Sequence, residues 1–304
     1  MNYRHAYHAG SFADVLKHAV LALIVEYLKR KPEPFRVIDT HAGGGRYALD
    51  SAEAAKTAEW QGGIGRLLGA GAVPLPAPVA ALLAPYLDAV RAENAGRALS
   101  VYPGSPLIAR RLMRADDVLV ANELHPDEYA RLKTAAGRDR RVRVLALDGW
   151  LALRSQLPPK ERRGLVLIDP PFEEGGEVRR MVEGLGEGLR RFAAGIYVAW
   201  YPIKDPRSLT WFHRALRAID AGKQPLRIEM MLRRPVDLDR LNGCGLVVLN
   251  PPHTLRDDLA RILPELTRRL RDGGGARFYL APIDGADGQV YRSATPRPGK
   301  RAIS

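Results

Sequence analysis

The residues Asp169, Pro170, Pro171 and Phe172 come directly after an apolar stretch, and their types suit a planar group that carries an NH2. Residues 165–168 are all apolar, which predicts a strand covered on both faces of a parallel sheet. The two prolines end it, because proline has no N–H to donate to a ladder. Asp169 and the carbonyl of Pro170 can accept the two amino protons while Phe172 stacks on the ring. Held in this way, the nitrogen of a nucleobase amino group could attack an electrophilic carbon.

The same segment also fits a plainer interpretation, in which a strand ends in a proline turn and Asp169 serves as a helix N-cap. A nucleobase would first have to leave its stack to reach such a pocket. The segment alone therefore leaves both interpretations open, and the other strand ends must decide between them.

Seven apolar stretches predict the strands of a doubly wound, mostly parallel α/β sheet. Their ranges are 35–39, 117–123, 142–147, 164–168, 195–200, 226–232 and 245–249. Helical patterns within residues 1–30 and at 107–114 and 126–136 alternate with them. Residues 48–100 interrupt this order with helix-like stretches at 52–68 and 77–95, so we expect a small helical insertion there, either to grasp a substrate or as mere elaboration.

Three more of these strands end on residues that suit a nucleoside. The first leads into three glycines, 43–45, where backbone can approach a ligand closely. The second ends on Glu123, where such folds hold ribose hydroxyls, and the third is followed by Asp148 and Gly149. That aspartate can accept from an adenine amino group. Four strands ending in this way favour a nucleoside site over four unrelated caps.

The composition is that of a soluble globular protein, with 46% hydrophobic and 27% charged residues among 304. No apolar run approaches the roughly 20 residues that span a bilayer. The start lacks the features of a signal peptide, so we expect a cytoplasmic protein with no membrane partner. One cysteine, Cys244, excludes an internal disulfide. The histidines His5, His8 and His18 have no matching carboxylate or cysteine spacing, so we expect no metal.

The net charge of +13 and a pI near 10.1 favour a polyanionic partner such as nucleic acid. Arginines cluster at 110–111, 138–143, 162–163, 179–180 and 268–269. The alternative is compositional, because the whole chain is rich in Ala, Gly, Arg and Pro. The expected domain organisation is a lid helix and first strand (1–47), the insertion (48–100), the remaining core (101–283) and a basic mobile tail (284–304).

A second segment of similar type, Asn250-Pro251-Pro252-His253, ends the last expected strand. Asparagine can replace aspartate in such motifs, so this segment is an alternative candidate for the same role. It has no aromatic residue after the prolines and lies beyond the nucleoside-binding strands, which makes it the weaker candidate.

Several motifs resemble those of the bacterial 23S ribosomal RNA adenine-N6 methyltransferases. They are Tyr3-Arg-His5, His8-Ala-Gly10, Ala13-Asp-Val-Leu-Lys-His18, Asp39-Thr-His-Ala-Gly43, Tyr102-Pro-Gly-Ser-Pro106, Glu123-Leu-His-Pro126 and Leu167-Ile-Asp-Pro-Pro171. The resemblance implies a class I, Rossmann-like methyltransferase that uses S-adenosyl-L-methionine to methylate N6 of one adenosine in 23S ribosomal RNA, either naked or in an assembly intermediate.

The same resemblance implies a role for each matching residue. Asp169 would be the catalytic acceptor, and Tyr3 would contact the RNA together with Pro170 and Phe172. The cofactor-binding residues, with Lys17 placed beside the site, would be Lys17, His18, His41, Ser105, Glu123, Asp148 and Gly149. Two positions depart from the family pattern: Phe172 replaces the usual Tyr and loses its hydroxyl, and Gly44 replaces the usual Ala, a change expected to be harmless.

Two other functions fit part of the pattern. A DNA adenine methyltransferase shares the Asp-Pro-Pro-aromatic chemistry, although an insertion of residues 48–100 is small for a target-recognition domain. A basic nucleic-acid-binding protein with a degenerate site would share the charge and would not bind S-adenosylmethionine.

Overall fold

The computed structural model describes residues 5–96, 98–173, 175–283 and 291–293. Its main sheet has the strand order β5-β4-β1-β6-β7-β9-β8-β10-β11. In chain order these strands are β1 (Arg36–Asp39), β4 (Val118–Asn122), β5 (Val142–Leu145), β6 (Gly164–Ile168), β7 (Ile196–Ile203), β8 (Leu226–Met231), β9 (Gly243–Leu249), β10 (Arg277–Pro282) and β11 (Tyr291–Ser293).

The strands expected from the sequence all form, and the predicted fold class is confirmed. β5, β4, β1, β6 and β7 run parallel to one another, whereas β9 is antiparallel to β7 and β8. β10 and β11 were not expected. The stretch of β10 is short and ends on a proline, and it becomes a strand because it pairs with β8 along its whole length.

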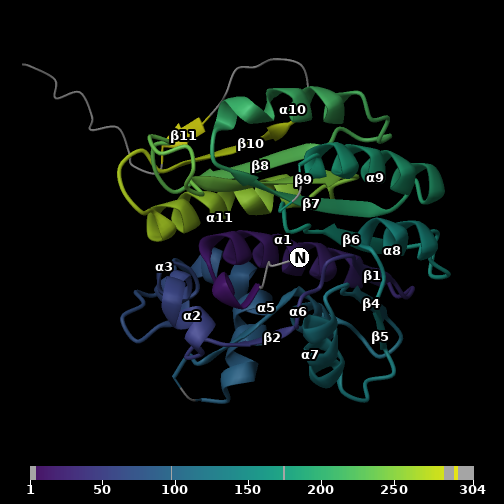
Figure 1. The fold of residues 1–304 in the computed structure, drawn as a ribbon, viewed down its shortest axis with the longest axis horizontal. Coiled ribbons are helices and arrows are strands. Elements are labelled where there is room, and N and C mark those ends of the chain that lie inside the picture. Colours follow the sequence, from purple (N-terminus) through teal and green to yellow (C-terminus); the bar gives the residue numbers. More distant parts are fainter. Residues whose placement is uncertain (1–4, 97, 174, 284–290, 294–304) are drawn as a thin grey trace, which may run out of the picture.

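Helices cover both faces of this sheet (Figure 1). One face packs against α1 (Phe12–Lys29), α5 (Ala77–Asn94), α6 (Ser105–Leu112) and α11 (Leu255–Leu270), and the other against α8 (Gly149–Ser155), α9 (Glu177–Arg191) and α10 (Thr210–Arg217). Strand β6 serves both, because side chains alternate along a strand: Leu165 and Leu167 join the first core, and Val166 and Ile168 the second. The continuous apolar run of β6 follows from this double burial.

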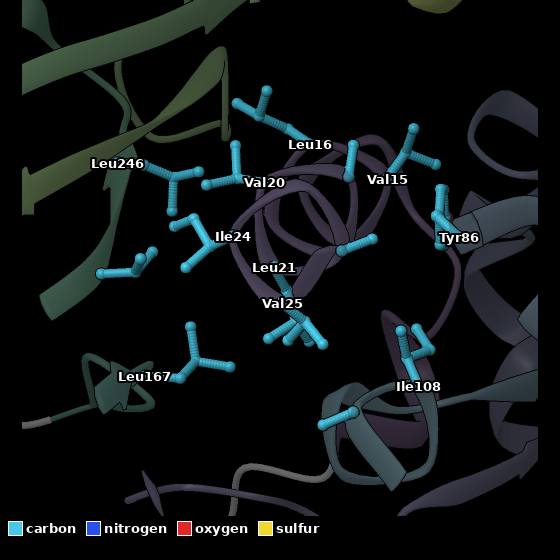
Figure 2. Close-up of a cluster of buried hydrophobic side chains, with 14 of the residues drawn as sticks. Val15, Leu16, Val20, Leu21, Ile24, Val25, Tyr86, Ile108, Leu167 and Leu246 are labelled. Carbon is cyan, nitrogen blue, oxygen red and sulfur yellow. The ribbon is translucent and has the colours of Figure 1, made fainter. Parts of the chain in front are cut away.

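Helix α1 lies at the centre of the first core, as Figure 2 shows. Its apolar side chains meet Leu167 of β6 and Leu246 of β9 on one side, and Tyr86 of α5 and Ile108 of α6 on the other. A helix enclosed in this way buries polar residues as well, and Lys17 and His18 are only 4% and 0% exposed. Burying polar and charged side chains costs free energy unless they have hydrogen-bond or ion-pair partners. Residues of the candidate active site are such partners for Lys17 and His18.

The stretch 52–68 was expected as one helix and is instead three short ones: α2 (Ala52–Thr57), α3 (Glu59–Gly62) and α4 (Gly65–Leu68). Ala58 breaks the first with a φ of +50°. At Gly63 a Cβ would lie 2.0 Å from the carbonyl oxygen of Gly10, so contact with the N-terminal segment breaks the second. The second expected helix forms as α5, which packs in the same core as α1.

Residues 48–100, the expected insertion, are bordered by β2 (Arg46–Ala48) and β3 (Val101–Pro103), which pair with each other in a small antiparallel sheet. The helix expected at 126–136 forms as α7 (Pro126–Ala136). Of the expected tail, 284–304, only β11 belongs to the described residues, so the prediction for the rest lies outside them. In the described part of the chain, no helix is long and apolar enough to cross a membrane.

Candidate active site

A cavity of about 430 Å³ opens where β1, β4, β5 and β6 reach their carboxyl ends. In open α/β sheets this is the edge at which ligands bind. All the residues predicted to bind a cofactor line it, and Asp169 lines it with them. Those residues are Lys17, His18, His41, Ser105, Glu123, Asp148 and Gly149.

Glu123 is held in place by backbone on both sides of the cavity. Its Oε2 accepts from the N–H of Gly43 at 2.9 Å and its Oε1 from the N–H of His125 at 2.7 Å. Burial raises the pKa of this carboxyl, and the two N–H donors oppose the shift. Each carboxylate oxygen retains a second lone pair, so Glu123 can still accept from the hydroxyls of a ribose.

Asp148 and Gly149 begin α8 at the next strand end. Asp148 Oδ1 caps the helix by accepting from the N–H groups of Trp150 and Leu151, both at 3.0 Å. The cap uses Oδ1 only and fixes the direction of Oδ2. Gly149 leaves room for His41, because a Cβ there would lie 2.2 Å from His41 Nε2. Burial lowers the pKa of His41 to about 4, so its imidazole is neutral at pH 7.

Ser105 lines the cavity as the first residue of α6, whose N-cap is Gly104, so its side chain does not cap the helix. Its Oγ donates instead to Asp39 Oδ2 at 2.6 Å. Ser105 is thus bonded to a carboxylate at the end of β1, and no local sequence pattern reveals this contact.

Asp39 is a site residue that the sequence analysis quoted in a motif without assigning it a role. It is 1% exposed, and burial raises its pKa to about 6. Besides Ser105 it accepts from the N–H of His41 at 3.4 Å. Asp39 therefore positions two cavity-lining residues. Its position could have identified it from the sequence, because Asp39 ends a predicted strand just as Glu123 does, and Asp148 and Asp169 directly follow two others.

His18 projects from α1 into a buried hydrogen-bond chain. Its Nδ1 lies 2.7 Å from the hydroxyl of Tyr102, which lies 2.9 Å from that of Tyr86. Burial lowers the pKa of His18 to about 3, so the ring is neutral. Its Nε2 has no hydrogen-bond partner among the described residues. When Tyr102 donates to Nδ1, the proton is on Nε2, which lies 3.8 Å from Asp14 Oδ1.

Lys17 pairs with Asp169 across the cavity, joining α1 to the end of β6. Its Nζ also lies 2.9 Å from Asp14 Oδ1. Although burial opposes it, the charges of Asp14 and Asp169 raise the pKa of Lys17 well above its ordinary value. Asp14 in turn accepts from the N–H of Gly10 and from His5 Nε2, each at 2.9 Å. The carboxylate of Asp169 thus faces a fixed cation.

The predicted base-binding residues are placed less uniformly. Pro171 lines the cavity, whereas Pro170 and Phe172 lie outside its lining. Phe172 adopts a φ of +53° and packs edge-on against Trp200, with ring centroids 5.7 Å apart. Tyr3 lies outside the described residues. Trp150, which the sequence analysis did not single out, lines the cavity and lies edge-on to His41 at 5.7 Å.

The cavity is acidic although the chain as a whole is basic. Its acidic lining residues are Glu123, Glu128, Asp148, Asp169, Glu173 and Glu177, and its cationic ones are Lys17 and Arg180. This local excess of carboxylates favours a small cationic ligand inside. The net charge of +13 must therefore lie on the rest of the molecule, where it favours a polyanion.

The early histidines each have protein partners. His5 pairs with Asp14 at 2.9 Å, His8 with Glu59 at 3.1 Å, and His18 with Tyr102 at 2.7 Å. Within the described ranges, no group of three His, Cys, Asp or Glu side chains could hold a metal ion.

The alternative catalytic segment at Asn250 is excluded. Because β9 is antiparallel to β7, its carboxyl end lies at the opposite edge of the sheet from Asp169. Asn250 lines a different hollow, and its Nδ2 donates to the carbonyl oxygens of Ala193 at 2.7 Å and Gly195 at 2.8 Å. The sequence pattern gave no sign of the strand's direction.

Comparison with known proteins defines the class first. A crystal structure of protein LPL1258 from Legionella pneumophila str. Philadelphia 1 is 33% identical and superposes with a TM-score of 0.81 over 90% of this chain and 98% of that one. Two curated relatives are named Ribosomal RNA large subunit methyltransferase J. The one from Escherichia coli (strain K12) is 42% identical over 90% of this chain and 95% of its own length.

The second, from Haemophilus influenzae (strain ATCC 51907 / DSM 11121 / KW20 / Rd), is 42% identical over 89% of this chain and 94% of its own length. The fold and these relatives define a class I methyltransferase. The profile of the family described as Ribosomal RNA large subunit methyltransferase D, RlmJ, matches residues 32–279. The chain belongs to this family, and the family expected from its motifs is confirmed.

Proposed function

We propose that this chain transfers a methyl group from S-adenosyl-L-methionine to N6 of one adenosine in 23S ribosomal RNA. The observation that carries the proposal is the position of Asp169 in the same cavity as Glu123, Asp148 and His18. An acceptor for an amino group and a set of nucleoside contacts thus share one enclosed space. The names of the curated relatives support ribosomal RNA as the substrate class.

The donor atoms of the cavity fit this cofactor. The sulfonium group of S-adenosyl-L-methionine supplies an electrophilic methyl group. Glu123 would accept from the ribose hydroxyls, Asp148 Oδ2 would accept from the adenine amino group, and His18 Nε2 would donate to the carboxylate. The excess of acidic side chains suits a ligand with positive charges on sulfur and on the amino group.

Asp169 would hold the target amino group of a flipped adenine by accepting one of its protons. Transfer of the methyl group would form a nitrogen–carbon bond and break the carbon–sulfur bond, leaving a neutral thioether and positive charge on the nitrogen. The fixed carboxylate of Asp169 would stabilise that charge more in this state than in the ground state and would then accept the amino proton that the nitrogen loses. Pro170 and Phe172 would complete the base pocket, with Tyr3 contacting the RNA.

Lys17 would orient Asp169 before the base arrives. Once the amino group engages Asp169, Lys17 remains paired because Asp14 is its second acceptor at 2.9 Å. A buried ammonium without that second partner would be costly. We also propose that residues 48–100 form a distinct insertion on the core 101–283. The lid role expected for the helix within residues 1–47 does not fit α1, because α1 lies enclosed at the centre of the first core. Residues 291–293 of the expected tail belong to the sheet as β11.

The test is the transfer of labelled methyl from S-adenosylmethionine to deproteinised, unmodified 23S ribosomal RNA, to the assembled large subunit and to duplex DNA. We expect label on RNA, recovered as N6-methyladenosine. The better RNA substrate distinguishes action before assembly from action after it. Label on DNA alone would establish the DNA methyltransferase instead, and a protein that releases no heat with S-adenosylmethionine would be a binding protein with a degenerate site.

A further inference from the structure

Helix α10 has one face in the core and one in solvent. Phe212 and Leu216 are buried between α10 and the sheet, and Phe212 lies edge-on to Tyr201 with ring centroids 5.0 Å apart. Trp211 lies outside this buried face of α10 and is 48% exposed. The neighbours of Trp211 already anchor the helix, so packing alone does not explain an indole at this position.

Arg179 covers this exposed indole. Its guanidinium carbon lies 5.7 Å from the centre of the Trp211 ring, within the range of a cation–π contact. Arg179 belongs to the first turn of α9, and α9 and α10 lie next to each other on one face of the sheet (Figure 1). We call Trp211 and Arg179 together the Trp211 platform.

The platform lies beside the active-site cavity. Arg180, the residue after Arg179, lines that cavity. The first turns of α9 and α10 both lie near the catalytic edge, because each helix follows a parallel strand, β6 or β7, that ends there. A chain that places one residue in the cavity can therefore reach the platform with a neighbouring residue.

The surroundings of the platform are cationic. Arg214 is exposed one helical turn after Trp211, and Arg207 precedes it with 80% of its side chain exposed. Arg207 pairs with Asp205 at 3.1 Å, whereas Arg179 and Arg214 have no ion-pair partner among the described residues. A flat ring bordered by guanidinium groups matches a nucleotide, whose base stacks and whose phosphate is anionic. A protein partner would require a wider apolar area than one indole among arginines.

We propose that the Trp211 platform stacks an unpaired base of the RNA substrate that flanks the target adenosine. This rests on the proposed function and adds a determinant of substrate recognition to it. Stacking outside the cavity holds the neighbouring nucleotide while the target base is turned into the site, and so favours an adenosine in a loop or bulge over one in a continuous helix. Trp211 acts in binding and takes no part in methyl transfer.

The experiment measures kcat and KM for methyl transfer to unmodified 23S ribosomal RNA with Trp211→Ala, Trp211→Phe and Arg179→Ala. Loss of one base–aromatic stack should raise KM for RNA about tenfold in Trp211→Ala, with kcat within about twofold of the unaltered protein. Trp211→Phe should restore most of the loss. The matched control is Arg190→Ala, which removes an exposed arginine from the far end of the same helix α9 and should leave KM unchanged.

Calorimetry with S-adenosylmethionine and a melting temperature are recorded for each variant. An unchanged KM for RNA in Trp211→Ala overturns the inference. A rise in KM in Trp211→Phe as large as that in Trp211→Ala overturns it as well, because an aromatic ring at this position would then make no difference to RNA binding. A fall in melting temperature accompanied by a fall in kcat would assign Trp211 a structural role and overturn it as well. Failure of the unaltered protein to methylate RNA at all would instead reject the proposed function.

Discussion

The segments Asp169–Phe172 and Asn250–His253 have nearly the same sequence pattern and opposite roles. Each comes after a fully buried strand, each contains two prolines, and each has a residue with positive φ, at +53° for Phe172 and +52° for Asn250. The difference arises from strand direction. β6 runs parallel to its neighbours and places Asp169 at the edge of the sheet that carries the cavity, whereas β9 runs antiparallel and places Asn250 at the other edge.

The partners of the two polar side chains differ accordingly. Asp169 meets Lys17, a charged side chain in a cavity, so its carboxylate is presented to a ligand. Asn250 donates both amide protons to the carbonyl oxygens of Ala193 and Gly195, so neither proton is available to a ligand. Its side chain instead ties two loop segments together. A motif therefore indicates chemistry only when its strand ends at the edge where the other ligand-binding residues lie.

The largest expected effect comes from exchanging the two side chains. Asp169→Asn should lower methyl transfer about 10³-fold, about 4 kcal/mol, with cofactor binding retained, because an amide does not stabilise positive charge on the attacking nitrogen. Asp169→Asn combined with Asn250→Asp should be equally inactive. Recovery of transfer in the double variant would show that the Asn250 segment can serve catalysis and would break the comparison.

The next effect concerns the space that the catalytic edge keeps for a ligand. Gly149→Ala should weaken S-adenosylmethionine binding roughly tenfold to a hundredfold in calorimetry, because its Cβ would lie 2.2 Å from His41 Nε2 and displace that ring. Gly44→Ala is the matched control, since its Cβ would lie 2.4 Å from the carboxylate end of Glu128 and 3.3 Å from Arg131 Cβ, away from His41. Equal losses in both variants would contradict a specific role for the Gly149 gap.

Asn250→Ala should act on stability and leave catalysis intact. Two carbonyl oxygens lose their amide donor and alanine must adopt a φ near +52°, which together should lower the free energy of unfolding by about 2 kcal/mol in urea titrations. The transfer rate at 25 °C should stay within about twofold. A variant of normal stability and low activity would reverse the assignment of the two segments.

The smallest effect is on the pH dependence of stability. His18 and His41 are neutral in the fold, with pKa values lowered by burial to about 3 and about 4, whereas His253 beside Asn250 is exposed. Their contribution is fully present above the unfolded pKa of about 6.5 and is lost as pH falls, at ~1.4 kcal/mol per unit and per histidine. Asp39, whose burial raises its pKa to about 6, opposes this between pH 6 and 4.

His18→Asn should therefore lose about 1.4 kcal/mol less stability per pH unit than the unaltered chain between pH 6 and 4. The comparison of the two urea-unfolding curves isolates His18, because Asp39 and His41 are common to both proteins. Parallel curves for the two proteins would mean that His18 is not held neutral by burial.

Local pattern determined much of this protein. The apolar runs that became β4, β6 and β9 could be identified because strands buried on both faces need continuous hydrophobic sequence. The edge strand β5 is only partly buried and gave a weaker apolar pattern. The acids at the ends of these strands were recognisable for the same reason, since each stands where such a run stops. Asp169, Glu123 and Asp148 were thus available from the sequence, and their common cavity followed from parallel strands meeting at one edge.

Only the tertiary structure decided which residues those acids face. Ser105 binds Asp39 across 66 residues of sequence, and Lys17 reaches Asp169 across 152, contacts set by the packing of α6 and α1 on the sheet. The direction of β9 was equally hidden, because an apolar run is the same in a parallel or an antiparallel ladder. Residue type and spacing determine which reactions the side chains can support. The pairing of distant strands and helices determines which of these side chains come together in one cavity.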